Sequence, residues 1–149
     1  MQDGPSNPIV GGWGAFADGA ESEPSVELDE HRVLVVEDDP ALREIYAGAL
    51  RGFGHDVRTA SDGVAAFDAL KNGWEPCVVF LDLRMPGMDG WEFSRRLRAE
   101  SRWQAVHVVV VAAHFRIDQE AADIGADAWL QKPFDLARLD EETRTLCTN

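Results

Sequence analysis

Residues Val78 to Gly90 read Val-Val-Phe-Leu-Asp-Leu-Arg-Met-Pro-Gly-Met-Asp-Gly. The stretch begins as a continuous apolar run with one carboxylate, Asp82, near its end. A short run of this composition, ended by Pro86 and Gly87, predicts a strand that is buried on both faces. Asp82 is then expected at the carboxyl end of a central parallel strand, where open α/β sheets bind ligands. The simpler interpretation, a carboxylate that bonds only to its own loop, stays open.

Segments typical of strands and helices alternate five times along the chain. Apolar or β-branched runs predict strands at 32–36, 55–60, 77–82, 106–112 and 128–131. Apolar residues at helical spacing predict helices at 40–52, 64–70, 91–100, 118–124 and 136–146. The candidate N-caps are Asp39, Ser61 or Asp62, Asp89 and Asp135. This alternation predicts an α/β domain with a doubly wound, five-stranded parallel sheet and helices on both faces.

The helical spacing also predicts which large side chains lie against the sheet. These are Leu42, Ile45 and Ala49 in the first helix, Val64, Phe67 and Leu70 in the second, and Phe93 and Leu97 in the third. We expect Trp74, Trp91 and Trp103 to be partly exposed packing residues.

Length and charge restrict the class of protein. The chain has 149 residues, enough for one domain with a hydrophobic core, and no apolar run long enough to span a membrane. Its N-terminus shows no signal-peptide pattern. The net charge is −13, from 14 basic and 27 acidic residues, which argues against direct binding to nucleic acid or to an anionic membrane. The spacing of Cys77 and Cys147 is typical neither of a disulfide framework nor of a metal site, which fits a reducing cytoplasm.

Residues 1–30 differ in composition from the rest of the chain. They contain seven acidic residues and no basic one, and their hydrophobic residues include Ile9, Val10, Trp13 and Phe16. We expect a flexible acidic N-terminal arm at 1–30 and a folded domain at 31–149. Two readings of the arm stay open: a disordered leader, and a short aromatic motif that docks on this domain or on a partner.

Charged residues follow three of the predicted strands. Glu37 and Asp38 follow the first strand, Asp82 ends the third, and Lys132 follows the fifth. The carboxyl ends of parallel strands meet at one edge of a sheet, so these side chains are expected to lie together. Clustered carboxylates need a compensating cation, and oxygen ligands suit Mg²⁺. A carboxylate beside Mg²⁺ and a lysine is arranged to attack phosphorus and form an acyl phosphate.

Three motifs carry a resemblance to a known family. They are Val-Leu-Val-Val-Glu-Asp-Asp-Pro, Leu-Asp-Leu-Arg-Met-Pro-Gly-Met-Asp-Gly and Gly-Ala-Asp-Ala-Trp-Leu-Gln-Lys-Pro-Phe. In this order they resemble the receiver domain of bacterial two-component response regulators, over about residues 31–146. The resemblance implies a flavodoxin-like fold with strand order 2-1-3-4-5. It also implies that the chain receives a phosphoryl group from a histidine kinase or a phosphotransfer protein.

The resemblance assigns roles to individual residues of this chain. Asp82 would be the phosphoacceptor, and Glu37, Asp38 and Asp82 would bind Mg²⁺ together with the backbone carbonyl of Arg84. Lys132 would bond to the phosphoryl oxygen or to Asp82.

The same resemblance covers two further positions. Pro133 matches the family's cis-proline after the lysine, and Trp129 occupies the position of the family's switch aromatic. For Trp129, plain packing on an edge strand is the alternative.

One position departs from the family pattern. Ala112 stands where Thr or Ser is usual, and alanine has no hydroxyl that could bond to a phosphoryl group. The loss of one neutral hydrogen bond is worth about 0.5–1.5 kcal/mol, enough to weaken a conformational switch without preventing phosphorylation. Arg84 and His114 flank the path of an attacking water in the family, so they are expected to set the lifetime of the phosphoryl group. A solvated loop histidine is the alternative for His114.

Three functions compete at this point. The first is a phosphorylated receiver, not an enzyme, that signals through the face formed by its fourth helix, fifth strand and fifth helix, with a homodimer left open. The second is a pseudo-receiver that acts as a phosphorylation-independent interaction module, favoured by Ala112. The third, an aspartate-based Mg²⁺ phosphatase, is disfavoured because Arg84 replaces a second carboxylate two residues after Asp82. Nucleotide binding is disfavoured because no glycine-rich phosphate loop follows the first strand.

Overall fold

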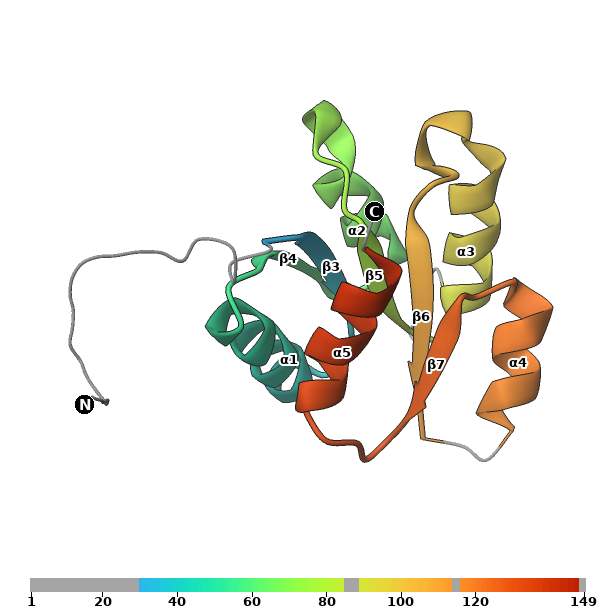
Figure 1. Cartoon of the computed structure of the whole chain (residues 1–149). Helices are drawn as coiled ribbons and strands as arrows, with labels where there is room; N and C mark the ends of the chain where they lie inside the picture. Colours follow the sequence, from blue (N-terminus) through green and yellow to red (C-terminus); the bar gives the residue numbers. More distant parts are fainter. Residues whose placement is uncertain (1–29, 85–88, 114–115, 148–149) are drawn as a thin grey trace, which may run out of the picture.

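The computed structural model describes residues 30–84, 89–113 and 116–147, and in these ranges five parallel strands form one sheet. The strands are β3 (Arg32–Val36), β4 (Asp56–Ala60), β5 (Val78–Asp82), β6 (His107–Ala112) and β7 (Ala128–Gln131). Their order across the sheet is β4-β3-β5-β6-β7, which confirms the predicted order 2-1-3-4-5 (Figure 1).

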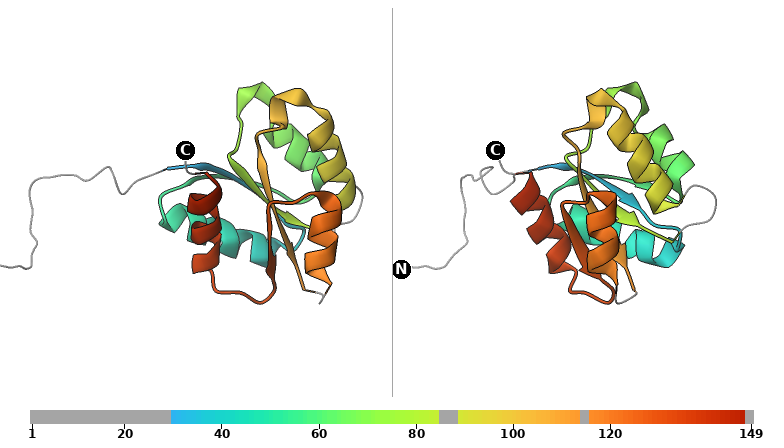
Figure 2. Two further views of the ribbon diagram at one scale, coloured as in Figure 1. Left: turned by 45° about the vertical axis from the view of Figure 1, so that its right-hand side comes forward. Right: turned by 90° about the vertical axis from the view of Figure 1, so that its right-hand side faces the viewer.

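Helices cover both faces of the sheet. They are α1 (Pro40–Gly52), α2 (Gly63–Ala69), α3 (Gly90–Ala99), α4 (Ile117–Ile124) and α5 (Ala137–Leu146), with short 3-10 helices η3 (Lys71–Gly73) and η4 (Ser101–Trp103). α1 and α5 lie on one face, and α2, α3 and α4 lie on the other (Figures 1 and 2). The doubly wound architecture expected from the alternation of strands and helices is therefore confirmed.

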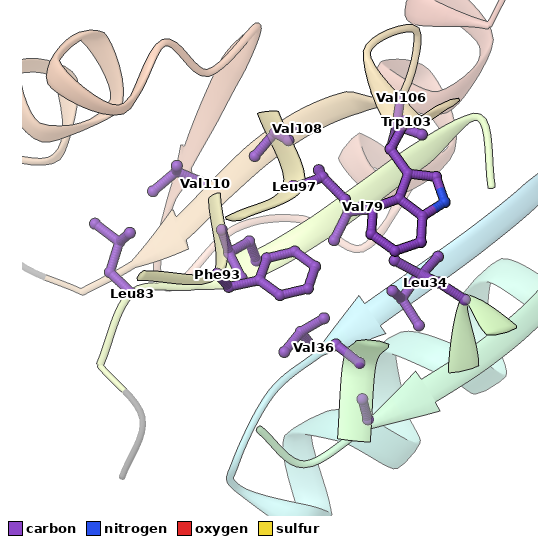
Figure 3. Packing of buried hydrophobic residues seen from close by; sticks show 14 of the residues in the cluster. Leu34, Val36, Val79, Leu83, Phe93, Leu97, Trp103, Val106, Val108 and Val110 are labelled. Atoms are coloured by element: carbon purple, nitrogen blue, oxygen red, sulfur yellow. The ribbon is translucent and has the colours of Figure 1, made fainter. Parts of the chain in front are cut away.

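Alternate residues of the central strands supply two separate cores. Val33 and Val35 of β3 face α1 and α5, whereas Leu34 and Val36 face α2, α3 and α4. Figure 3 shows the core on the side of α2, α3 and α4, in which Phe93 and Trp103 lie among the leucine and valine side chains of β3 and β5. All five residues of β5 are buried, as expected for a central parallel strand.

Aspartates begin three of the helices, as predicted. Asp39 accepts from the N–H groups of Ala41 and Leu42 at the start of α1. Asp62 and Asp89 cap α2 and α3 in the same way. At α5 the helix begins later than predicted, at Ala137, and Asp135 instead accepts from the Ala137 N–H at 2.9 Å, just before the first turn.

Two predicted core positions, one in α1 and one in α2, are wrong. Ile45 is 48% exposed and Val64 is 57% exposed, while Tyr46 and Leu50 of α1 are buried. α1 is amphipathic, but Ile45 and Tyr46 are neighbours, and packing against β4, α5 and β3 buries Tyr46 rather than Ile45. Among the tryptophans, Trp74 and Trp103 are buried rather than partly exposed, whereas Trp91 is 38% exposed.

The prediction for the cysteines is also wrong. Cys77 and Cys147 form a disulfide across 70 positions of sequence, with Cα atoms 5.9 Å apart. Sequence spacing could not reveal this pair because the fold, not the local sequence, brings the end of α5 beside the start of β5. The predicted acidic arm lies almost wholly outside the described residues, so the boundary at residue 30 stays a prediction. In the described ranges, no helix is long and apolar enough to span a membrane.

Candidate functional site

Parallel pairing gathers the predicted site residues at one edge of the sheet. Val36 of β3 pairs with Leu81 of β5, so the residue that follows β3 lies beside the residue that ends β5. On the other side, Ala112 of β6 pairs with Gln131 of β7, and the N–H of Lys132 donates to the Ala112 carbonyl at 2.8 Å. In Figure 1 this is the lower edge, where β6 and β7 end.

Three carboxylates meet at this edge. One oxygen from each of Glu37, Asp38 and Asp82 lies within 4.8 Å of the other two. Glu37 and Asp82 are only 2% and 6% exposed, while Asp38 is exposed to solvent. Buried carboxylates at this separation repel one another, so the cluster needs positive charge nearby.

Lys132 supplies part of that charge. Its Nζ donates to Glu37 Oε1 at 2.9 Å and lies 3.9 Å from Asp82 Oδ2. The side chain is 19% exposed, so its ammonium is held in a largely buried position. One ammonium against three carboxylates leaves an excess of negative charge at the site.

Burial affects the pKa values of Asp82 and Lys132 in different ways. Burial and, to a smaller extent, Glu37 raise the pKa of Asp82 to about 7 against the opposing effect of the Arg84 N–H. Burial alone would lower the pKa of Lys132, but its hydrogen bond to Glu37 and the charges of Asp82 and Glu37 outweigh burial and raise that pKa. Lys132 therefore stays charged, and Asp82 is poised to lose or gain a proton near neutral pH.

The loop after β5 holds Asp82 in place through its backbone. The Arg84 N–H donates to Asp82 Oδ1 at 3.1 Å, and the Gly90 N–H donates to the Leu83 carbonyl at 3.3 Å. A Cβ atom at Gly90 would lie 2.8 Å from the Asp82 carbonyl oxygen and 2.9 Å from the Leu83 Cα. The glycine of the Met-Asp-Gly motif is thus required by the close approach of two backbone segments.

Two contacts around Glu37 were not predicted from the sequence. Arg43 Nη1 donates to the Glu37 carbonyl at 2.9 Å, and the Asp39 N–H donates to Glu37 Oε2 at 3.2 Å. The only signal for Arg43 was its place about one helical turn into α1, on the side facing the acidic loop.

An aromatic contact near the site was also not predicted. The rings of Tyr46 and Phe134 stack, 5.4 Å apart, which anchors the segment after Lys132.

The cluster lines an open cleft of about 520 Å³. Its walls include Leu42 and the small residues Ala112 and Ala113, so space remains above the carboxylates. A larger groove of about 980 Å³ lies over α3, but there Arg95 and Arg96 already pair with Glu92. The smaller cleft is therefore the site where chemistry-bearing groups converge.

The donor set suits a small divalent cation. Mg²⁺ binds oxygen ligands at about 2.1 Å, which spans ligand pairs up to about 4 Å apart and needs only a small closure of the three carboxylates. An ion with two positive charges would also balance the excess negative charge. Glu37, Asp38 and Asp82 are the residues that would hold it.

The remaining predicted site residues are placed as follows. The Lys132–Pro133 peptide bond is cis. The Arg84 side chain is 71% exposed, and its Nη2 lies 3.9 Å from Glu120 Oε2 on α4 rather than over Asp82. Trp129 is 44% exposed on β7, an edge strand. His114 lies outside the described residues.

Comparison of this chain with known proteins identifies a family and several relatives. The family model described as the response regulator receiver domain matches residues 33–144. The transcriptional regulatory protein TcrA of Mycobacterium tuberculosis is 39% identical over 115 residues, which are 77% of this chain and 45% of TcrA. The DNA-binding dual master transcriptional regulator RpaA of Synechocystis sp. is 34% identical over 117 residues, or 77% of this chain and 48% of RpaA. The chain thus spans about half the length of these curated relatives.

Two solved structures are similar to this chain in fold. The chemotaxis protein CheY4 of Vibrio cholerae has a TM-score of 0.72 at 28% identity, covering 78% of this chain and 98% of that one. The receiver domain of the sensor histidine kinase PA1611 from Pseudomonas aeruginosa has a TM-score of 0.73 at 25% identity, covering 80% and 99%. That structure holds a magnesium ion coordinated in its active site cleft.

Proposed function

We propose that this chain, which belongs to the response regulator receiver domain family, accepts a phosphoryl group on Asp82 from a histidine kinase or a phosphotransfer protein. The observation that carries the proposal is the meeting of three carboxylates and one lysine at the carboxyl edge of the sheet. Each of the three segments that supply these side chains comes from a different strand end, so the arrangement depends on the whole fold.

The transfer would begin with the carboxylate form of Asp82. A carboxylate oxygen attacks the phosphorus of a phosphohistidine, the phosphorus–nitrogen bond breaks, and the electron pair leaves with the imidazole nitrogen, which takes up a proton. The product is an acyl phosphate on Asp82. The Arg84 N–H, which donates to Asp82 Oδ1 at 3.1 Å, orients the carboxylate toward the cleft.

Positive charge at the site would stabilise the phosphoryl group in transit. Lys132 Nζ lies 3.9 Å from Asp82 Oδ2, close enough to bond to a phosphoryl oxygen after a small movement away from Glu37. Mg²⁺ held by Glu37, Asp38 and Asp82 would neutralise the charge of the carboxylates and of the phosphoryl oxygens. The magnesium ion in the PA1611 receiver domain, at 25% identity, supports this assignment.

The output surface would be the face made by α4, β7 and α5. Trp129 and Leu136 on this side are 44% and 36% exposed, and an exposed tryptophan is a typical anchor for a protein contact. We assign to this face a downstream protein or a second copy of the chain. Trp129→Ala should weaken that contact at least tenfold and leave phosphorylation unchanged.

One observation favours a second candidate, a pseudo-receiver that signals without phosphorylation. Ala112, 2% exposed and at the end of β6, offers no hydroxyl to a phosphoryl group. The intact set of Glu37, Asp38, Asp82 and Lys132 argues against this candidate. Turnover of phosphate esters is a third and weaker one, because the second residue after Asp82 is Arg84, which has no carboxylate to act as acid or base.

Phosphorus NMR of the chain with phosphoramidate tests the assignment. This donor has the phosphorus–nitrogen bond of phosphohistidine. The receiver function predicts a protein-bound acyl phosphate signal that needs Mg²⁺ and disappears on addition of hydroxylamine. A pseudo-receiver would show no bound signal, and an esterase would release inorganic phosphate continuously from a generic phosphate ester.

A further inference from the structure

The disulfide lies at the edge of the sheet opposite the carboxylate cluster. Cys77 comes directly before β5, and Cys147 directly follows α5. They are the two cysteines of the chain. The bond therefore joins the amino end of the central strand to the carboxyl end of the last helix, and no step of the phosphoryl chemistry uses it.

Solvent reaches this bond through a groove. Both cysteines line a depression of about 400 Å³ at the amino ends of the strands. Cys147 is 6% exposed and belongs to the core beside α1 and α5, whereas Cys77 is half-buried, and both residues line the depression. The charged and titratable side chains around it are Glu30, His31, Arg32, Glu75, Arg102 and His107. A disulfide whose cysteines line an open groove can be approached by thiols and small disulfides from that side.

The bond secures one end of α5, and other contacts secure the opposite end. Leu139 near the start of the helix is fully buried, and Asp140 accepts from His55 Nε2 at 2.7 Å. His55 Nδ1 accepts the His31 N–H at 3.2 Å, so Nε2 carries the hydrogen and donates the hydrogen bond to Asp140. In the middle, Thr143 Oγ1 donates to the Leu139 carbonyl of the same helix at 2.8 Å.

The last turn of α5 combines contacts within the helix with packing of Leu146 and Cys147 on the core. Beyond Thr143, Arg144 pairs with Asp140 of the same helix, and Leu146 is only partly buried. The Cys147 N–H donates to the Thr143 carbonyl at 2.9 Å, which again lies within the helix. The bond to Cys77 adds a covalent connection between this turn and the sheet to the packing of Leu146 and Cys147 on the core.

We propose that Cys77 and Cys147 form a reversible thiol–disulfide pair that fastens or frees the last turn of α5. The oxidant is a small disulfide of the glutathione class. The thiolate of one cysteine attacks a sulfur of the oxidant, the oxidant's sulfur–sulfur bond breaks, and one thiol leaves. The second thiolate attacks the mixed disulfide, releasing the other thiol. Two cysteine thiols are oxidised to one disulfide, and one oxidant disulfide is reduced to two thiols.

Disulfides in reducing compartments are transient and respond to oxidants. The proposal is independent of phosphorylation, so a chain that never accepts a phosphoryl group could still carry this pair.

The test uses the full chain in buffers of glutathione and glutathione disulfide, with maleimide labelling of free thiols after unfolding. Since the chain has two cysteines, two labels report the reduced form and none reports the bond. We expect both forms to interconvert while the protein stays folded. In the Cys147→Ser variant, Cys77 should instead take up one glutathione, seen by intact mass.

Hydrogen exchange measures the effect on α5. Reduction should raise the exchange rates of amides 144–147 at least tenfold and leave those of β5 unchanged. Oxidation should raise the Tm by about 5–15 °C, the range expected for a bond that closes a long loop in a domain of this size.

Four results would overturn the proposal. The bond could resist reduced glutathione until the protein unfolds, which would make it a permanent structural bond. The thiols could stay free in glutathione disulfide, or they could link two chains, as a non-reducing gel would show. Unchanged exchange at 144–147 between the two redox forms would remove the assigned role.

Discussion

Lys132 Nζ donates to Glu37 Oε1 at 2.9 Å, although 95 positions separate the two residues in the sequence. Glu37 is almost fully buried, and its other oxygen accepts the Asp39 N–H at 3.2 Å. The pair thus links the end of β3 to the end of β7 across the site. Asp82 lies between these strand ends, and its negative charge is less well balanced than that of Glu37, because Lys132 is 3.9 Å from Asp82 and 2.9 Å from Glu37. This charge balance controls the behaviour expected of the site.

Removing the ammonium should destabilise the metal-free protein. Lys132→Met keeps most of the apolar stem but leaves Glu37 and Asp82 buried beside each other without a cation. We expect a loss of about 2–3 kcal/mol in the free energy of unfolding at pH 8, measured by urea denaturation without Mg²⁺. Excess Mg²⁺ should restore part of the loss.

The other lysine of the chain offers a matched control. Lys71 pairs with Asp68 at 3.1 Å, but both side chains are more than 60% exposed. Lys71→Met should change stability by less than about 0.5 kcal/mol. Equal effects of the two substitutions would contradict the charge balance assigned to Lys132.

The stability of the metal-free protein should depend on pH through Asp82. Its pKa is about 7 in the folded state, against about 3.9 in an unfolded chain. Between these values the folded state binds more protons than the unfolded state, so this carboxyl makes stability fall as pH rises. Asp82→Asn should therefore stabilise the protein, by an amount that grows from pH 4 to 8 and reaches on the order of 2–4 kcal/mol.

Urea denaturation of both proteins across this range, with a chelator present, measures the difference. Asp68→Asn, at an exposed carboxylate, serves as the control. A difference between Asp82→Asn and wild type that stays constant with pH would show that Asp82 does not titrate near neutrality.

A hydroxyl at position 112 should strengthen the response to phosphorylation. Ala112→Thr places a donor at the end of β6, beside the cleft, where one hydrogen bond to a phosphoryl oxygen is worth about 0.5–1.5 kcal/mol. Ala112→Val has nearly the same shape and no hydroxyl, so it separates bonding from packing. We expect phosphorylation to slow hydrogen exchange in β7 and α4 more in the threonine variant than in the valine variant. Identical responses of the two variants would show that the hydroxyl plays no part in this protein.

Two glycines should respond in opposite ways to alanine. Gly90→Ala forces a Cβ against the Asp82 carbonyl and should cost roughly 1–3 kcal/mol while disturbing the site. Gly48, in the middle of α1, has open space around its Cβ direction, and Gly48→Ala should stabilise the protein by about 0.5–1 kcal/mol. Thermal unfolding of both variants checks the pair, and a tolerated Gly90→Ala would contradict the close approach described for the loop.

The sequence was informative wherever a local pattern decides the structure. The apolar run before Asp82 and the cap at Asp89 predicted β5 and the start of α3, because strand burial and capping depend on neighbouring residues. The motif residues Glu37 and Lys132 were also expected together, since the ends of parallel strands share an edge.

Features set by distant contacts could not be predicted in this way. The burial of Tyr46 instead of Ile45 depends on the angle at which α1 packs on the sheet. The Cys77–Cys147 bond joins positions 70 residues apart, and the Arg43 contact with the Glu37 carbonyl depends on a side chain turning back over its own loop.

The most direct test of the central claim is the intact mass of the full chain after incubation with acetyl phosphate and Mg²⁺. The account predicts a gain of one phosphoryl group that is absent without Mg²⁺ and absent in Asp82→Asn. An adduct that persists in Asp82→Asn would contradict the assignment of the acceptor. The lack of any adduct on folded wild-type protein, together with no binding of Mg²⁺, would contradict the receiver function itself.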